Sequence, residues 1–228
     1  MKIRRLSAAA PPPVPVSGAG VQVQILATEH WSLLASRSTT QSEILVRITM
    51  FLTLVSATVV SLALVGQIIG FTSTFAWFAV GLLAIVSIVG SLTAVRVVNG
   101  SIEDFAYVLG MNRLRAAYVK LDPAVQQHFV TSIHDDFAGI TATYNPVERS
   151  TPSQFLGSSS MFVLVIDSAV FGVLGAALLV ALGASTPISV VIGVVCAVVY
   201  LVVALTLGLR RFGRIRKSMA PTSPTPQP

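Results

Sequence analysis

Charged residues are scarce in this chain of 228 residues: they account for 11% of positions, while hydrophobic residues account for 54%. Soluble domains carry about 25% charged residues. The mean hydropathy of +0.80 points in the same direction. A soluble enzyme, a secreted disulfide scaffold and a disordered protein are therefore excluded as descriptions of the whole chain. We expect an integral membrane protein.

Cysteine and catalytic signatures are also lacking. Cys196 is the single cysteine, which excludes an intrachain disulfide. The sequence has no Ser-His-Asp order, phosphate-binding loop, HExxH motif or dinucleotide fingerprint. His128 and the run His134-Asp135-Asp136 contain metal-capable side chains, but their spacing fits a solvated helix end better than a metal site. We therefore predict a protein that is not an enzyme and has no cofactor or metal.

Four hydrophobic segments dominate the sequence, at residues 44–69, 74–98, 161–183 and 187–209. Each has the roughly 20 residues that a helix needs to cross the hydrocarbon of a bilayer. Short uncharged turns join the first pair at residues 70–73 and the second pair at residues 184–186. We predict an all-α membrane protein with transmembrane hairpins at residues 44–98 and 161–209 and a helical insertion between them.

The net charge of +6 is concentrated after the last hydrophobic segment, in a basic, proline-rich tail at residues 210–228. Bases beside a membrane segment indicate orientation and contact with anionic lipid headgroups, so nucleic acid is not an expected partner. Because neither short turn contains a base, we expect both termini and the middle region in the cytoplasm. The predicted headgroup contacts are Arg210, Arg211, Arg214, Arg216 and Lys217.

The N-terminal region is predicted to have two parts. Residues 1–27 are rich in Ala, Pro and Gly and lack the apolar core of a signal peptide, which predicts a disordered cytoplasmic tail. Residues 28–43 are predicted to lie at the membrane surface, as a short helix with Trp31 at the headgroups. Thr40-Gln41-Ser42-Glu43 matches a capping box, which would start the first membrane helix near Gln41.

The region between the hairpins, residues 99–160, is predicted to be cytoplasmic. Apolar residues at helical spacing from Ile102 to Leu121 predict that the second membrane helix continues there, unless Gly100 interrupts it. Asp122-Pro123 is a start signal for another helix, which would close near Asn145. A linker then returns to the membrane, and the last eight residues are expected to stay extended. The ordered part is too small for a large core of its own, so we expect it to pack on a copy, the membrane or a partner.

Asp167 is the only acid inside a hydrophobic segment. An Asp at the centre of a span costs about 2.5 to 3.5 kcal/mol even on lenient insertion scales, so it should face protein or water. Arg96 and Arg47 are the counter-ions at similar depth, which makes these three residues a candidate intramembrane charge cluster. We favour a structural ion pair or a hydrogen-bonded clamp; an ion or proton pathway and a wet interface remain alternatives.

Small and hydroxyl residues recur every four positions on three of the predicted helices. Such stripes let helices approach closely, or alternatively line a pore, and we favour close packing. The candidate polar stripe on the first helix comprises Thr49, Thr53 and Ser61. The stripes on the third and fourth helices are Ser168, Gly172, Ala176 and Ser189, Gly193, Ala197.

The segments TEHWSLLASRSTTQSE, GMNRLRAAY and IHDD resemble a group of uncharacterised bacterial four-helix integral membrane proteins over roughly residues 28–140. This resemblance implies a multi-pass protein of the bacterial plasma membrane. The layout of a helix, a two-crossing hairpin and a helical extension is more loosely similar to SLATT-type membrane effector domains, which are thought to form pores.

Two functional hypotheses follow. The first is a self-assembling, homo-oligomeric channel or pore with Thr49, Thr53 or Asp167 near the path. The alternative is a membrane scaffold or accessory subunit that docks a cytoplasmic protein through its helices. The residues expected to dock that protein are Tyr107, Met111, Tyr118 and Phe129.

Overall fold

The computed structural model describes residues 18–145 and 157–226, and this part of the chain is helical without any strand. Four long helices and two short ones make up the fold. Their bounds are α1 Gly18–Ile69, α2 Ser73–Leu121, η1 Pro123–His128, α3 Phe137–Tyr144, α5 Ser159–Ala181 and α6 Thr186–Ser218. The all-α prediction is confirmed for these residues.

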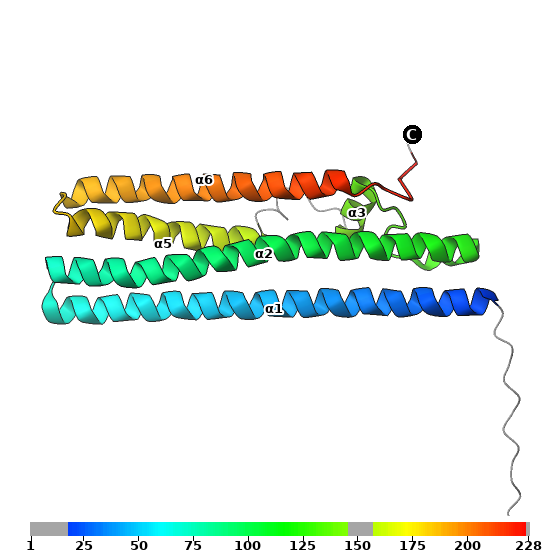
Figure 1. Cartoon of the computed structure of the whole chain (residues 1–228), viewed down its shortest axis with the longest axis horizontal. Helices are drawn as coiled ribbons and strands as arrows, with labels where there is room; N and C mark the ends of the chain where they lie inside the picture. The colour runs from blue at the N-terminus through cyan, green and yellow to red at the C-terminus, as the bar shows by residue number, and fades with distance from the viewer. Residues whose placement is uncertain (1–17, 146–156, 227–228) are drawn as a thin grey trace, which may run out of the picture.

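The long helices lie side by side in the order α1, α2, α5, α6 (Figure 1). The main packing pairs are α1 with α2, α2 with α5, and α5 with α6, whereas α2 and α6 contact each other only slightly. Consequently α1 and α6 each keep a broad apolar surface uncovered. All four are long and apolar enough to cross a membrane, and lipid or another protein must cover those faces.

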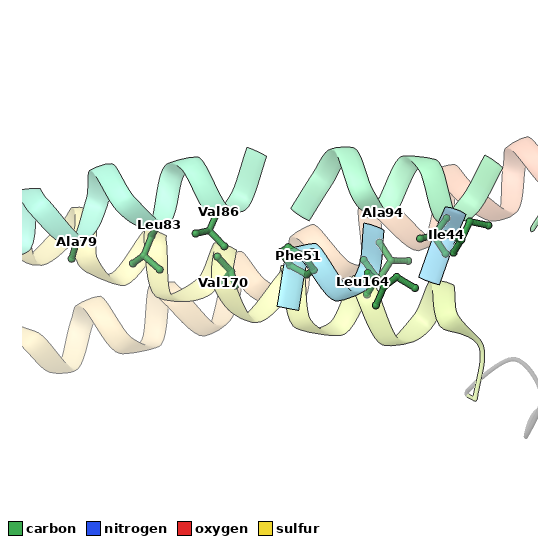
Figure 2. Packing of buried hydrophobic residues seen from close by; sticks show 11 residues of the cluster. Ile44, Phe51, Ala79, Leu83, Val86, Ala94, Leu164 and Val170 are labelled. Carbon is green, nitrogen blue, oxygen red and sulfur yellow. The ribbon is translucent and has the colours of Figure 1, made fainter. Parts of the chain in front are cut away.

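A buried apolar core runs along α1, α2 and α5, and partly buried residues of α6 pack against it. Figure 2 shows Phe51 of α1, Val86 of α2, and Leu164 and Val170 of α5 in this core. Phe51 and Val86 are almost completely buried, at 0% and 1% exposed. The two tight turns are at glycines with positive φ, Gly70 at 66° and Gly183 at 89°, a conformation that glycine adopts without strain.

The structure corrects the predicted start of the first membrane helix. α1 runs without a break from Gly18, so residues 18–27 are helical rather than disordered; residues 1–17 lie outside the described part. Thr40 is buried inside the helix and caps nothing. Because α1 continues past the apolar segment, Trp31 lies on the same helix about 20 Å from Ile44.

The middle region differs from the prediction in part. α2 continues to Leu121 as expected, and Gly100 does not interrupt it: a Cβ there would collide with Ile44, so this glycine lets α1 and α2 approach. Asp122 does cap the next helix, accepting from the Ala124 backbone N–H at 2.9 Å. That helix, η1, is however only a six-residue 3-10 helix, and α3 starts separately at Phe137. Most of the predicted linker, residues 146–156, lies outside the described part.

Candidate functional site

The described residues beyond the apolar segments form one packed unit, which we call the distal module. It comprises residues 18–43 of α1, 99–121 of α2, residues 122–145 with η1 and α3, and residues 210–226. A second apolar core holds it together, with Val108 fully buried and Leu33, Phe212 and Met219 packed around it. The region between the hairpins therefore packs on α1 and the end of α6 in the same chain, which the sequence did not predict.

The first charged cluster of the module lies where the apolar segments end. Arg96 of α2 contacts Glu43 Oε2 at 2.9 Å and Glu103 Oε1 at 3.1 Å, and Arg47 contacts Glu43 Oε1 at 3.0 Å. The hydrogen bonds from Arg96, and then from Arg47, lower the pKa of Glu43 to about 2. Both arginines are thus neutralised by glutamates, so the predicted cluster of Asp167, Arg96 and Arg47 is wrong.

Asp167 is fully buried between three helices and is held by hydroxyl groups instead of cations. The Tyr200 hydroxyl of α6 donates to Asp167 Oδ2, and the Ser91 hydroxyl of α2 donates to the same oxygen at 3.3 Å. Phe171 stacks on the Tyr200 ring with centroids 4.2 Å apart. This arrangement ties α2, α5 and α6 together and leaves Asp167 away from any open surface of the chain.

The sequence contains a pattern that identifies Tyr200 as the partner of Asp167, although we expected an arginine. Asp167 lies fourteen residues before the end of α5 at Ala181, and Tyr200 lies fourteen residues after the start of α6 at Thr186. Two antiparallel helices joined by a tight turn bring such positions to the same depth. A tyrosine in an otherwise apolar segment needs a hydrogen-bond partner, and Asp167 is the acid at its level.

A second charged cluster joins α1, α2 and α3 inside the distal module. Arg37 Nε contacts Asp104 Oδ1 at 2.6 Å, and Gln41 Nε2 donates to the same oxygen at 3.2 Å. The Tyr144 hydroxyl of α3 donates to Asp104 Oδ2. Burial, and then this contact with Asp104, raises the pKa of Tyr144. The cluster fixes where α3 lies against the two long helices.

The third cluster fastens the end of the chain to the module, and we call it the C-terminal clasp: Arg113, Asp135, Asp136 and residues 222–225. The carboxylate of Asp135 is 0% exposed and contacts Arg113 Nε at 2.7 Å. It also accepts from the backbone N–H groups of Thr222 at 2.8 Å and Ser223 at 2.6 Å. Thr225 donates to Asp136 through its backbone at 3.0 Å and its hydroxyl at 2.8 Å.

The clasp corrects two expectations. Asp135 and Asp136 are not a solvated helix end, because the tail covers them. The proline-rich end is non-helical as expected, but Thr222, Ser223 and Thr225 are held by hydrogen bonds; residues 227–228 lie outside the described part. Burial raises the pKa of Asp135, but hydrogen bonds from Thr222, Arg113 and Ser223 outweigh it and bring the pKa to about 2.

We predict that Asp135→Asn releases the tail at neutral pH. Losing the charge-assisted bonds removes about 1–3 kcal/mol, so hydrogen exchange at the amides of Thr222 and Ser223 should accelerate about tenfold to a hundredfold. Asp122→Asn is the matched control, because Asp122 caps η1 without touching the tail. Unchanged exchange in Asp135→Asn would contradict the clasp.

The pH dependence of the clasp follows from the same group. The pKa of Asp135 falls from an ordinary 3.8 to about 2 on folding, so the carboxylate stabilises the protein above pH 4. This stabilisation is lost as the pH falls through about 2. Exchange protection of the tail, corrected for intrinsic rates, should stay constant from pH 7 to pH 5 and collapse below pH 3.

The small-residue stripes of α5 and α6 pack on each other as favoured from the sequence, whereas the stripe on α1 does not pack on another described helix. A Cβ on Gly172 would lie 2.8 Å from the Gly193 carbonyl oxygen, and one on Gly193 would lie 2.9 Å from the Ala176 Cβ. On α1, the exposed hydroxyls of Thr49 and Thr53 donate to carbonyls of their own helix, at 2.9 Å each. Thr49 and Thr53 therefore point away from the other helices and line no channel within one chain, while Ser61 is partly exposed.

The remaining predicted residues have mixed positions. Met111 is buried, and Tyr118 lies between His30 and Phe129, so these proposed docking residues are internal contacts. Among the basic residues of the tail, Arg216 lies 4.7 Å from the centre of the Phe137 ring. The two most exposed large apolar residues of the module are instead Trp31 at 70% and Val130 at 86%.

Residues 18–145 and 157–226 contain no group of three His, Cys, Asp or Glu side chains that could hold a metal ion. No protein-family model, curated protein or solved structure matches this chain. The arrangement of its own side chains is therefore what supports a functional proposal.

Proposed function

We propose that this chain is a non-enzymatic membrane scaffold that presents its distal module in the cytoplasm to a protein partner. The observation that carries the proposal is that ion pairs and hydrogen bonds hold the helices of the distal module and the C-terminal segment together. Three clusters, centred on Glu43, Asp104 and Asp135, lock α1, α2, α3 and the C-terminal segment into one body. A preordered surface of this kind loses little conformational entropy on binding.

The orientation rests on the distribution of charge. The five bases that follow the fourth apolar segment belong to the distal module, while the turns at Gly70 and Gly183 carry no charge. By the positive-inside rule the module is cytoplasmic, the turns face outward and the helices make four crossings as two hairpins. The resemblance to bacterial membrane proteins supports the plasma membrane as the location.

The docking surface that we propose is the outer face of α1 in the distal module. Trp31 is 70% exposed and Leu34 is 41% exposed, on a straight helix that stands clear of the apolar segments. Exposed tryptophan is rare at a solvated surface and is enriched where proteins bind each other. An apolar helix face on the partner is the chemistry that would cover these two side chains.

Site-specific photo-crosslinking tests this function. A photo-reactive residue at position 31 should yield one discrete heterologous adduct in intact cells, whereas the same residue at position 33, which packs inside the module, should not. Trp31→Ser together with Leu34→Ser should abolish co-purification of the adduct partner without changing the level of the protein. Cross-links only to further copies of this chain would contradict the scaffold.

A channel is the second candidate, and the hydroxyl stripe on α1 is the observation that favours it. Thr49 and Thr53 lie on a face that no other described helix covers, so a ring of copies could place them around an axis. Such a channel would need self-assembly, because Asp167 is sealed inside the single chain. Ion flux through liposomes containing the purified protein separates the two candidates.

A further inference from the structure

A groove of about 290 Å³ lies between α2 and α6, where these helices fail to close on each other. Leu164 of α5, the helix between them, also lines it. Its walls are almost entirely apolar. They comprise Ser91, Ala94, Val95 and Val98 of α2 and Tyr200, Val203, Ala204, Leu207, Gly208 and Arg211 of α6.

The residues of α6 that line the groove recur every three or four positions, so they form one face of that helix. Gly208 has no side chain and so leaves space between the two walls: a Cβ there would already lie 3.9 Å from both methyl groups of Val98. At the rim, Val95 is 54% exposed and Leu207 is 60% exposed. The groove therefore opens on the outer surface of the apolar helices, the surface that lipid would cover.

The two ends of the groove differ in chemistry. At one end, the hydroxyls of Tyr200 and Ser91 are already bound to Asp167. At the other end, Arg211 is exposed and has no acidic partner among the described residues. The eleven helical steps from Tyr200 to Arg211 span about 16 Å, close to the 15 Å or so of one leaflet of hydrocarbon.

We propose that this groove binds an anionic phospholipid, with one acyl chain between α2 and α6 and the phosphate on Arg211. An apolar trough of one leaflet's depth that ends at a free guanidinium complements such a lipid in both length and charge. A free anion would leave the trough empty, and a zwitterionic lipid such as phosphatidylcholine would place a choline cation beside the phosphate that contacts Arg211, which weakens the attraction. The inference needs insertion in a membrane but is independent of partner docking.

Native mass spectrometry of the delipidated full-length protein tests the site, with phosphatidylglycerol and phosphatidylcholine of identical acyl chains as probes. One phosphatidylglycerol should bind each chain more tightly than all later ones. Arg211→Gln should weaken this first binding about fivefold, the value of one basic residue near a lipid surface. Gly208→Leu, which fills the trough, should weaken the binding of both lipids about tenfold.

Two controls match these variants. Arg210→Gln removes the same charge one residue away, where the side chain does not line the groove, and Gly213→Leu adds the same side chain where a Cβ meets nothing within 4 Å. Gly213→Leu should bind the first lipid like the wild type, and Arg210→Gln should weaken the first binding clearly less than Arg211→Gln does. Val95→Phe fills the trough from the opposite wall if Gly208→Leu fails to fold.

Three results would overturn the proposal. Equal losses in Arg210→Gln and Arg211→Gln, with no loss in Gly208→Leu, would mean diffuse attraction of the tail to lipid. Equal first affinities for the two lipids would remove the role of Arg211. A loss of oligomeric mass in Gly208→Leu with unchanged lipid binding would assign the groove to a second copy of the chain.

Discussion

Gly90→Ala is expected to destabilise the protein more than any other single methyl addition on α2. A Cβ at Gly90 would lie 2.7 Å from Asp167 Cγ and 2.8 Å from Phe51 Cε2, and both side chains are fully buried. Neither neighbour has space to withdraw, since Asp167 is bonded across three helices and Phe51 is packed in the core. Overpacking of this kind costs about 1–3 kcal/mol.

Reversible unfolding in mixed detergent micelles measures this cost. Gly81→Ala is the matched control, because a Cβ at Gly81 on the same helix meets nothing within 4 Å. The control should be neutral or slightly stabilising, since alanine is the better helix former. If both variants have the same stability, α1, α2 and α5 do not meet at Gly90 as described.

Asp167→Ala is expected to have the second large effect, because it leaves the hydroxyls of Tyr200 and Ser91 without their shared acceptor. Unpaired buried polar groups cost about 1–3 kcal/mol. Asp167→Asn should cost less, since the amide oxygen still accepts from Tyr200. Combined with Tyr200→Phe, either change should cost less than the sum of the single effects, with a coupling of at least about 0.5 kcal/mol.

Ion flux through liposomes, measured with the wild type and these variants, separates the scaffold from the channel. A structural clamp predicts that Asp167→Asn changes unfolding and leaves ion flux through liposomes at the level of protein-free vesicles. A channel predicts flux in the wild type and a change of that flux when Thr49 and Thr53, which would line its axis, are replaced by valine. Additive effects of Asp167 and Tyr200 on stability would contradict the clamp itself.

The helical architecture could be predicted from the sequence because the length and hydropathy of the apolar segments determine it. A run of about 20 apolar residues has few alternatives to a long helix, and Gly70 and Gly183 supply the turns between runs. The packing of Gly172 on Gly193 was accessible for a similar reason, since small residues four apart indicate close helix contact.

What the sequence did not predict are the partners of charged groups. Asp167 was expected to meet arginine, but Glu43 and Glu103 compete for Arg96, and Tyr200 lies at the level of Asp167. The clasp joins Asp135 to residues 87 and 88 positions later in the chain. No local sequence pattern predicts such a contact, because the contact depends on where the ends of the long helices lie in space.

The capping box at Thr40 failed for a different reason. A four-residue motif contributes about 1 kcal/mol, whereas a continuous α1 buries Thr40 and Ile44 against α2 and aligns Arg37 with Asp104. Tertiary contacts along the helix therefore outweigh the local signal. Trp31, which was expected at the membrane surface, lies on this continuous helix as an exposed residue of the distal module.

Cysteine accessibility in intact cells tests most directly whether the chain makes four crossings with the distal module in the cytoplasm. With Cys196→Ser removing the native thiol, single Ser73→Cys, Ser185→Cys and Ser218→Cys variants place one cysteine at an exposed position in each turn and at the end of α6. A membrane-impermeant maleimide should label Ser73→Cys and Ser185→Cys from outside, and Ser218→Cys only after the cells are opened. Labelling of Ser218→Cys in intact cells, or of one turn without the other, would contradict this topology.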